Sequence, residues 1–242
     1  PPTITKVKIG GMAHLTGPYA ETSVPMNIAW LDYTYWWNKE VGKRIGVNID
    51  LLLEDCRTDP TLISEIWMRF RDEEVVACLF TTSAENTILV DELENAQIPA
   101  VTGSISWYAY IPTRWNFSGY LSNTQTSLGL LRWLETPEGK EHEKNMPWMK
   151  EGRKPRIGYL AWDNPYGKSL LGPLFEYCKK HNVPWVGAEL VPYVFPTAEA
   201  QLKRLAANGA DYIHLSCCGS APAIIVRDAY RLKLKEQGTA IT

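Results

Sequence analysis

The sequence predicts an α/β protein made of two doubly wound parallel-sheet lobes. Short apolar segments alternate with helical patterns of ten or more residues along most of the 242 residues, which is typical of βαβ units and parallel sheets. The alternation is interrupted once, by an aromatic segment at 106–123 without a clear period, and then resumes. We therefore expect an N-terminal α/β lobe at 1–122 and a second α/β lobe at 123–242, with a ligand cleft between them.

Strands and helices alternate from the start of the first lobe. Asp59 and Pro60 mark the clearest helix start, because aspartate accepts hydrogen bonds from free helix N–H groups and proline fits the first helical position. In an earlier helix, Trp30, Tyr33 and Trp37 recur at helical spacing, so we expect them to pack into the core. The predicted strands are 6–12, 47–54, 75–80 and 98–102, and the helices are 25–41, one from residue 60 onward, and 84–95.

The second lobe repeats this alternation after one interruption. A charged segment at 135–154, which contains prolines and glycines, is predicted to be an exposed insertion. The predicted strands are 156–162, 185–191 and 212–216, with the start of another at 239–242. The predicted helices are 126–134, 166–181, 198–207 and 221–235.

The charge balance and the hydropathy exclude two classes of function. The chain has 25 basic and 27 acidic residues and a formal net charge of -2, so it offers no basic surface for nucleic acid. No apolar run approaches the roughly 20 residues that cross a bilayer. We therefore expect neither a nucleic-acid partner nor a membrane-spanning segment within this sequence.

The five cysteines do not form a recognisable metal motif. None belongs to a CxxC pair, and no histidine lies at metal-ligand spacing from them, so we expect no metal site and no cofactor. Cys78 lies in an apolar run and is predicted to be buried. Two disulfides remain open from the sequence, a Cys56–Cys78 bridge and a strained bridge between the adjacent Cys217 and Cys218, although free thiols are the simpler state of the adjacent pair.

Four segments, in this order, carry a resemblance to a known family. They are IGGMAHLTGPYA at 9–20, EDCRTDP at 54–60, TTSAENTILVDELENAQIPAVT at 81–102 and DNPYGK at 163–168. Together they resemble the type I periplasmic solute-binding proteins of the branched-chain amino acid and amide class (Leu/Ile/Val-binding-protein-like), which feed ABC transporters. Members of the family are longer, so the resemblance implies a C-terminally truncated chain whose second lobe lacks the third crossing and the remaining segments.

The resemblance also implies a function. We expect an extracytoplasmic receptor that captures an amino acid, an amide or urea, or an aromatic carboxylate by hinge closure, and delivers it to a membrane ABC-transporter permease. It would be a monomer and not an enzyme, and it would lie in the periplasm or outside the cytoplasmic membrane, with its leader removed or absent. The alternative with the same fold is a ligand-sensing domain of a regulator or receptor.

In the first lobe, the family binds the ligand's carboxylate through the loop after the third strand. Here Thr82 and Ser83 occupy that loop, just before a helix whose free N–H groups favour an anion. The structural alternative is that Ser83 only caps the helix. The loop after the fourth strand holds an ammonium or amide group in the family, and Ser104 and Ser106 match it, with Trp107 as an aromatic wall. This loop can equally be a polar turn that opens the hinge.

Three further residues match ligand contacts of the family. Tyr166 matches a tyrosine that reaches across from the second lobe, and a phenol suits this role because it packs and hydrogen-bonds at once. Tyr19 and Thr22 lie where the family contacts the ligand's side chain. The alternatives are helix packing for Tyr166 and an ordinary surface loop for the other two. Where the amino acid binders carry an aromatic residue after the strand at 212–216, this chain has two cysteines, which puts a standard aliphatic ligand in doubt.

The enzyme hypothesis finds little support in the sequence. GxGxxG, GxxxxGK[ST], HExxH and GxSxG are all absent. Cys217 or Cys218 with His14 is the candidate nucleophile–base pair, and nothing in the sequence brings these residues together. His214 lies within an apolar strand and is predicted to be a satisfied core residue.

Overall fold

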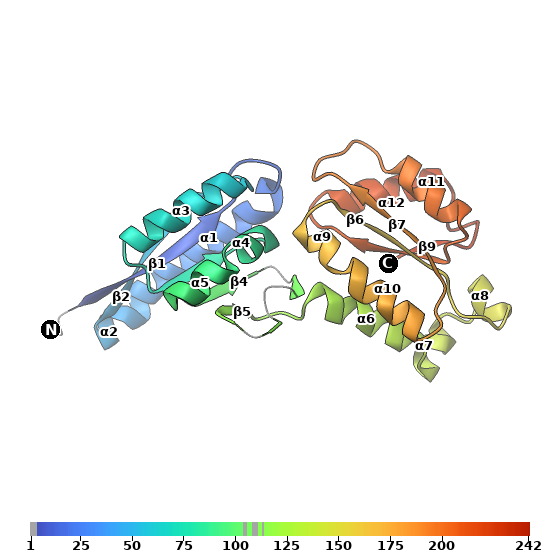
Figure 1. The fold of residues 1–242 in the computed structure, drawn as a ribbon, viewed down its shortest axis with the longest axis horizontal. Helices are drawn as coiled ribbons and strands as arrows, with labels where there is room; N and C mark the ends of the chain where they lie inside the picture. Colours follow the sequence, from blue (N-terminus) through green and yellow to red (C-terminus); the bar gives the residue numbers. More distant parts are fainter. Residues whose placement is uncertain (1–3, 104–105, 108–110, 113) are drawn as a thin grey trace. The chain divides into compact units, whose positions relative to one another are not determined.

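The computed structural model describes residues 4–103, 106–107, 111–112 and 114–242 (Figure 1). The chain divides into two compact units, Pro1–Tyr120 and Leu121–Thr242, which we call unit 1 and unit 2. Within the described residues, every helix is too short or too polar to cross a bilayer.

Unit 1 is built on a five-stranded parallel sheet with the order β2-β1-β3-β4-β5. All strands are parallel, but their order in the sheet reverses at β1, because β2 lies on one side of β1 and β3 lies on the other. In such sheets, ligands bind beyond the carboxyl ends of the strands at this switch point. The strands are β1 (Thr5–Ala13), β2 (Val47–Asp55), β3 (Ala77–Phe80), β4 (Ala100–Thr102) and β5 (Asn116–Ser118).

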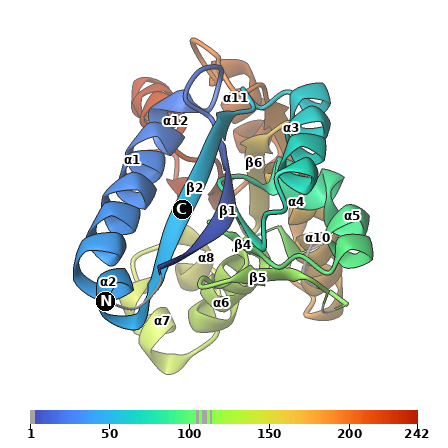
Figure 2. The ribbon, with the colours of Figure 1, turned by 90° about the vertical axis from the view of Figure 1, so that its left-hand side faces the viewer.

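The helices of unit 1 cover both faces of this sheet, with α1 and α3 on opposite faces (Figure 2). The helices are α1 (Ala20–Trp36), followed directly by a π-helical segment (Trp37–Gly42) and α2 (Lys43–Ile45), then α3 (Pro60–Asp72), α4 (Ser83–Ile88) and α5 (Val90–Ala96). The Asp59 side chain accepts hydrogen bonds from the N–H groups of Thr61 (2.7 Å) and Leu62 (3.4 Å), so the predicted helix start is confirmed.

Three features of unit 1 differ from the sequence-based predictions. The helix predicted at 84–95 is divided at Leu89, and β5 lies in the segment that showed no clear period. The packing prediction for the first helix is wrong for Tyr33, which is 56% exposed. Helical spacing shows that side chains share a face, but only the position of the helix on the sheet decides whether that face is covered.

The core of unit 1 lies between α3 and the sheet. Phe70 of α3 is fully buried, and its ring lies against β1 at Gly10. A Cβ added at Gly10 would come within 2.4 Å of that ring. Glycine at this position therefore allows α3 to pack closely on the sheet. The position of α3, which starts near the carboxyl edge, is fixed by this contact.

Unit 2 is built on a four-stranded parallel sheet with the order β7-β6-β8-β9. Its switch point lies between β6 and β8, so the loops after these two strands share one edge. The strands are β6 (Ile157–Trp162), β7 (Trp185–Val191), β8 (Tyr212–Ser216) and β9 (Ala240–Ile241). The helices are α6 (Asn123–Leu134), α7 (Pro137–His142), α8 (Pro147–Lys150), α9 (Pro165–Ser169), α10 (Leu171–Lys180), α11 (Glu199–Ala207) and α12 (Ala221–Arg231).

The segment at 135–154 is not simply an exposed insertion. It forms α7 and α8, and Trp148 of α8 is buried in the core that α6, α10 and β6 share. The Trp148 indole N–H donates to the Tyr212 hydroxyl at 3.3 Å, and the two rings meet edge to face. The charged composition of the segment concealed this anchor, because a single buried tryptophan gives no periodic signal.

Helix α9 packs closely onto the end of β6, and this contact can be tested. A Cβ added at Gly167 would lie 2.1 Å from the Trp162 carbonyl oxygen, and the Gly167 carbonyl accepts a hydrogen bond from the buried Tyr159 hydroxyl (2.6 Å). We expect Gly167→Ala to lower the free energy of unfolding by about 1–3 kcal/mol, because the helix must move off the strand.

Gly172→Ala is the matched control, since a Cβ on this glycine of α10 would meet no atom within 4 Å. Here we expect a gain of up to about 1 kcal/mol, because alanine is the better helix former. Urea denaturation of both variants measures the difference. Equal stability of Gly167→Ala and the unchanged chain would show that α9 is not held against the strand.

Candidate functional site

The polar loops of unit 1 gather at the carboxyl edge of its sheet. His14 follows β1, Cys56 follows β2 and Thr81 follows β3. Because the strands are parallel, and β1 and β2 remain in register up to the Ala13–Asp55 pair, these loops start at one level of the sheet. The edge next to the switch point is therefore the candidate site of unit 1.

The Asp55 carboxylate anchors the first of these loops. It accepts hydrogen bonds from the Leu15 N–H (2.9 Å), the Thr16 hydroxyl (2.6 Å) and the Arg57 N–H (3.2 Å). Partial burial raises the pKa of Asp55, but the hydrogen bonds from Thr16, Arg57 and Leu15 outweigh this effect and lower it. Asp55 is therefore ionised at neutral pH and joins the loop after β1 to the end of β2.

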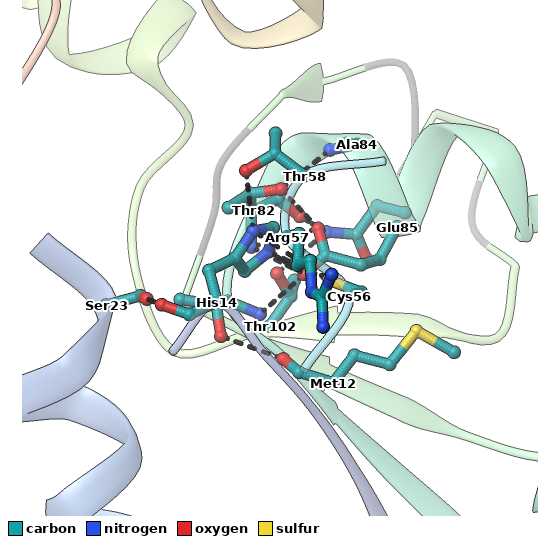
Figure 3. A network of polar contacts seen from close by, with 12 residues as sticks. Met12, His14, Ser23, Cys56, Arg57, Thr58, Thr82, Ala84, Glu85 and Thr102 are labelled. Atoms are coloured by element: carbon teal, nitrogen blue, oxygen red, sulfur yellow. Dashed lines mark hydrogen bonds and ion pairs between the residues drawn. The ribbon is translucent and has the colours of Figure 1, made fainter. Parts of the chain in front are cut away.

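A buried cluster of His14, Cys56 and Glu85 lies behind these loops (Figure 3). All three residues are fully buried. The imidazole lies between two partners, with Nε2 at 2.7 Å from Glu85 Oε1 and Nδ1 at 2.8 Å from Thr58 Oγ1. Cys56 Sγ lies 3.5 Å from His14 Nε2, and one ligand atom from each residue of the cluster lies within 4.8 Å of the others.

The cluster brings together three types of metal-binding atom, but its thiol is not an activated nucleophile. Burial raises the pKa of Cys56 to about 12, and the nearby Glu85 carboxylate adds to this shift. The thiol is therefore protonated and shielded at neutral pH. Spacing along the sequence could not reveal the cluster, because its members are separated by 42 and 71 residues. Both nitrogens of His14 face partners within unit 1, which removes the basis for pairing it with Cys217 or Cys218.

Thr82, and not Ser83, caps helix α4. The Thr82 hydroxyl accepts a hydrogen bond from the Ala84 N–H (3.1 Å) and donates one to the Glu85 carboxylate, which in turn accepts the N–H groups of Thr81 (3.3 Å) and Thr82 (3.1 Å). The alternative that Ser83 caps the helix is therefore wrong. Since Glu85 already occupies two donors before the helix, the expectation of free N–H groups here does not hold for Thr81 and Thr82. Ser83 is the first helical residue and is buried.

Buried polar atoms without a partner among the described residues lie near β3 and β4. They include the Ser106 hydroxyl and the side-chain oxygens of Asn27 and Asn86. The amide nitrogens of the two asparagines are satisfied, since Asn27 donates to Thr81 Oγ1 (3.3 Å) and Asn86 to Thr102 Oγ1 (2.7 Å). Unpaired buried polar atoms are costly, so this edge has hydrogen-bonding capacity for water or a bound molecule.

The structure places the remaining residues of unit 1 as follows. Tyr19 directly precedes α1, is half-buried, and meets the His14 ring edge to face at 5.7 Å. Thr22 lies in the first turn of α1 and is half-buried. Trp107, which follows Ser106 in the sequence, is also half-buried. Ser104 lies outside the described residues.

In unit 2, Tyr166 lies at the start of α9, on the edge shared by β6 and β8. Its carbonyl accepts hydrogen bonds from the Asn123 amide (2.9 Å) and the Ser169 hydroxyl (2.8 Å). Burial raises the pKa of Tyr166, the nearby Cys218 adds to the shift, and a polar contact with Ser216 opposes it.

The cysteines of the chain are all free thiols, including the adjacent Cys217 and Cys218. Cys56 follows β2 and Cys78 lies in β3, and β1 separates these two strands in the sheet. The Cys56–Cys78 bridge that the sequence left open does not form. Burial raises the pKa of Cys217 to about 12, so this thiol is also protonated at neutral pH. The two edges therefore present hydroxyl, amide and phenol groups, which can hydrogen-bond to a molecule.

Two parallel-sheet α/β units with polar loops at their carboxyl edges define the type I periplasmic-binding-protein fold. A profile of the family described as periplasmic binding protein matches residues 6–241. The chain therefore belongs to the periplasmic binding protein family, as the four sequence segments predicted. A comparison with curated protein sequences finds no match.

Solved structures share this fold at low sequence identity. An ABC-transporter solute-binding protein from R. palustris in complex with 4-hydroxybenzoate has a TM-score of 0.75 and 14% identity, covering 98% of this chain and 61% of its own. A branched-chain amino acid ABC-transporter protein from Thermus thermophilus with bound valine has a TM-score of 0.82, 19% identity and coverage of 96% and 58%. A fatty acid ABC-transporter substrate-binding protein from Thermomonospora curvata has a TM-score of 0.80, 17% identity and coverage of 96% and 57%. The present chain thus spans about 60% of the length of these proteins.

Proposed function

We propose that this chain is the ligand-binding part of an extracytoplasmic solute-binding receptor, not an enzyme, and that it delivers a small polar molecule to an ABC importer as a monomer. The observation that carries the proposal is the set of buried, unpaired polar atoms at the carboxyl edge of unit 1. A receptor pocket needs fixed hydrogen-bonding groups, whereas a hydrolase or transferase needs an activated nucleophile or base.

The proposed ligand carries a carboxylate or an amide. Ser83 would contact the carboxylate, and Ser106, together with Ser104, would hold an ammonium or amide group. Thr82 would contribute indirectly, by holding the start of α4 beside Ser83, since its hydroxyl and its N–H group are both engaged with Glu85. An amino acid, an amide or urea, and an aromatic carboxylate all fit this set, and two of these classes occur in the related structures with valine and 4-hydroxybenzoate.

Other residues would shape the site around the rest of the ligand. Trp107 would supply an aromatic wall, and Tyr19 with Thr22 would contact the side chain of the ligand. Tyr166 would close over the ligand from unit 2 through its hydroxyl. Closure of this kind requires that the ligand binds the closed state more tightly than the open state. The closed form would be recognised by the membrane permease.

A thermal-shift screen against amino acids, amides, urea and aromatic acids tests this proposal. A ligand at a hundredfold excess over its dissociation constant stabilises the chain by about 2.7 kcal/mol. We expect Ser83→Ala and Tyr166→Phe each to weaken binding roughly tenfold or more, because each loses a hydrogen bond to a polar ligand. Isothermal titration measures the dissociation constants, and mass spectrometry of the recovered ligand should find it unchanged.

The controls are Ser64→Ala and Tyr230→Phe. Ser64 donates to the Pro60 carbonyl within α3, and Tyr230 is 84% exposed on α12. Both variants should bind like the unchanged chain. Chemical conversion of the ligand would contradict the receptor proposal, and full binding by Ser83→Ala and Tyr166→Phe would place the site elsewhere.

A further inference from the structure

We propose that His14, Cys56 and Glu85 form a binding site for one divalent metal ion of the Zn²⁺ type, behind the ligand-binding edge of unit 1. These three residues offer an imidazole nitrogen, a sulfur and a carboxylate oxygen, the donor types that Zn²⁺ takes in proteins. They come from the loops after β1 and β2 and from α4. The expectation of no metal site rested on spacing along the chain, whereas folding assembles this donor set.

The distances fit a tetrahedral ion after two adjustments. For a Zn–S bond of about 2.3 Å and a Zn–N bond of about 2.0–2.1 Å, the sulfur and nitrogen ligands lie roughly 3.5 Å apart. Cys56 Sγ and His14 Nε2 are 3.5 Å apart, but the sulfur is also 3.8 Å from Nδ1. The sulfur therefore lies beside the ring and has to move toward the Nε2 side to share an ion with that nitrogen. Nitrogen and oxygen ligands lie roughly 3.3 Å apart around such an ion, while His14 Nε2 and Glu85 Oε1 are 2.7 Å apart. The Glu85 carboxylate therefore has to withdraw by about 0.6 Å to bind the same ion.

The protons and charges balance in this site. When the ion binds, Cys56 releases its thiol proton to solvent. His14 gives up the proton on Nε2, which faces Glu85, and carries one on Nδ1 instead. The Thr58 hydroxyl, at 2.8 Å from Nδ1, accepts that proton in a hydrogen bond. One thiolate and one carboxylate then balance the two positive charges of the ion, so the buried site as a whole carries no net charge.

The surroundings of the site hold its ligands in place. Glu85 is already oriented by the N–H groups of Thr81 and Thr82, and His14 by Thr58. Such outer contacts fix the orientation of metal ligands and raise metal affinity. A bound ion would join the loops after β1 and β2 to the start of α4, directly behind Ser83. The ion would therefore hold the ligand-binding edge of unit 1 in one arrangement.

Titration of the chelator-treated chain with Co²⁺ and Zn²⁺ tests the proposal. We expect one ion per chain, a thiolate-to-Co²⁺ charge-transfer band, and a Zn²⁺-dependent rise in melting temperature. Cys56→Ser should abolish the band, whereas Cys78→Ser, which alters another buried cysteine of unit 1, should retain it. Thr58→Ala should lower the affinity for Zn²⁺ by roughly 10–100-fold, because it removes the contact that orients His14.

Two other places on the chain could bind the ion adventitiously, the adjacent thiols Cys217 and Cys218 and the exposed His142 beside Glu143. The titration is therefore repeated with Cys217→Ser, Cys218→Ser and His142→Ala. X-ray absorption of the Zn²⁺-loaded unchanged chain gives a second measurement that needs no variant. One sulfur at about 2.3 Å with nitrogen and oxygen ligands supports the site. Two sulfurs, a band that survives Cys56→Ser, or no stoichiometric binding each overturn it.

Discussion

Replacing Glu85 by alanine is expected to lower the free energy of unfolding of unit 1 by about 3–5 kcal/mol. The buried carboxylate accepts hydrogen bonds from the Thr81 and Thr82 N–H groups, from the Thr82 hydroxyl and from His14. Alanine leaves these buried donors without an acceptor, and each unsatisfied donor carries its full desolvation cost. The loss exceeds that of a typical substitution because one carboxylate serves both the helix cap and the imidazole.

Urea denaturation followed by circular dichroism in the presence of a chelator measures this effect, and hydrogen exchange at Thr81 and Thr82 localises it. Glu73→Ala is the control, since Glu73 pairs with Lys8 on the surface at 2.7 Å and 56% of its side chain is exposed. That change should cost at most about 1 kcal/mol. A similar small loss for both variants would mean that the cluster around Glu85 is dispensable for the stability of unit 1.

Lowering the pH from 7 to 4 is expected to destabilise unit 2 through His214 by up to about 3 kcal/mol. Burial lowers the pKa of His214 to about 4, from the ordinary value of 6.5 that the unfolded chain retains. Between these two values, the unfolded state binds a proton that the folded state excludes, so stability falls as the pH falls. Below about pH 4 both states are protonated, and this contribution ceases to change.

The contacts of His214 explain why it stays neutral in the folded chain. Its ring lies between the Ser127 hydroxyl (2.7 Å) and the Thr242 hydroxyl (3.1 Å) and stacks against Tyr159, and none of these groups carries a compensating negative charge. His214→Gln should remove the extra pH dependence between 6.5 and 4. His142→Gln, at a side chain that is 70% exposed, should not. Parallel pH profiles for all three chains would contradict the assignment to His214.

Much of the fold could be predicted from the sequence because local patterns carry it. The alternation of apolar segments with helical patterns located the strands of both sheets except β5, and the Asp59–Pro60 pair placed the start of α3. Motifs also located loops at the carboxyl edges, including those with Ser83 and Tyr166. The hydrogen-bonding chemistry of a short segment, such as a helix cap, depends on neighbours only a few residues away.

The sequence by itself therefore determined the class of fold, the family and the loops where a ligand is proposed to bind. Only the tertiary structure decided that Thr82 caps α4, that Tyr33 remains exposed, and that His14, Cys56 and Glu85 meet. The physical reason is distance along the chain. Parallel strands bring loops separated by 42 and 71 residues to one edge, and no local period records which side chains then come into contact.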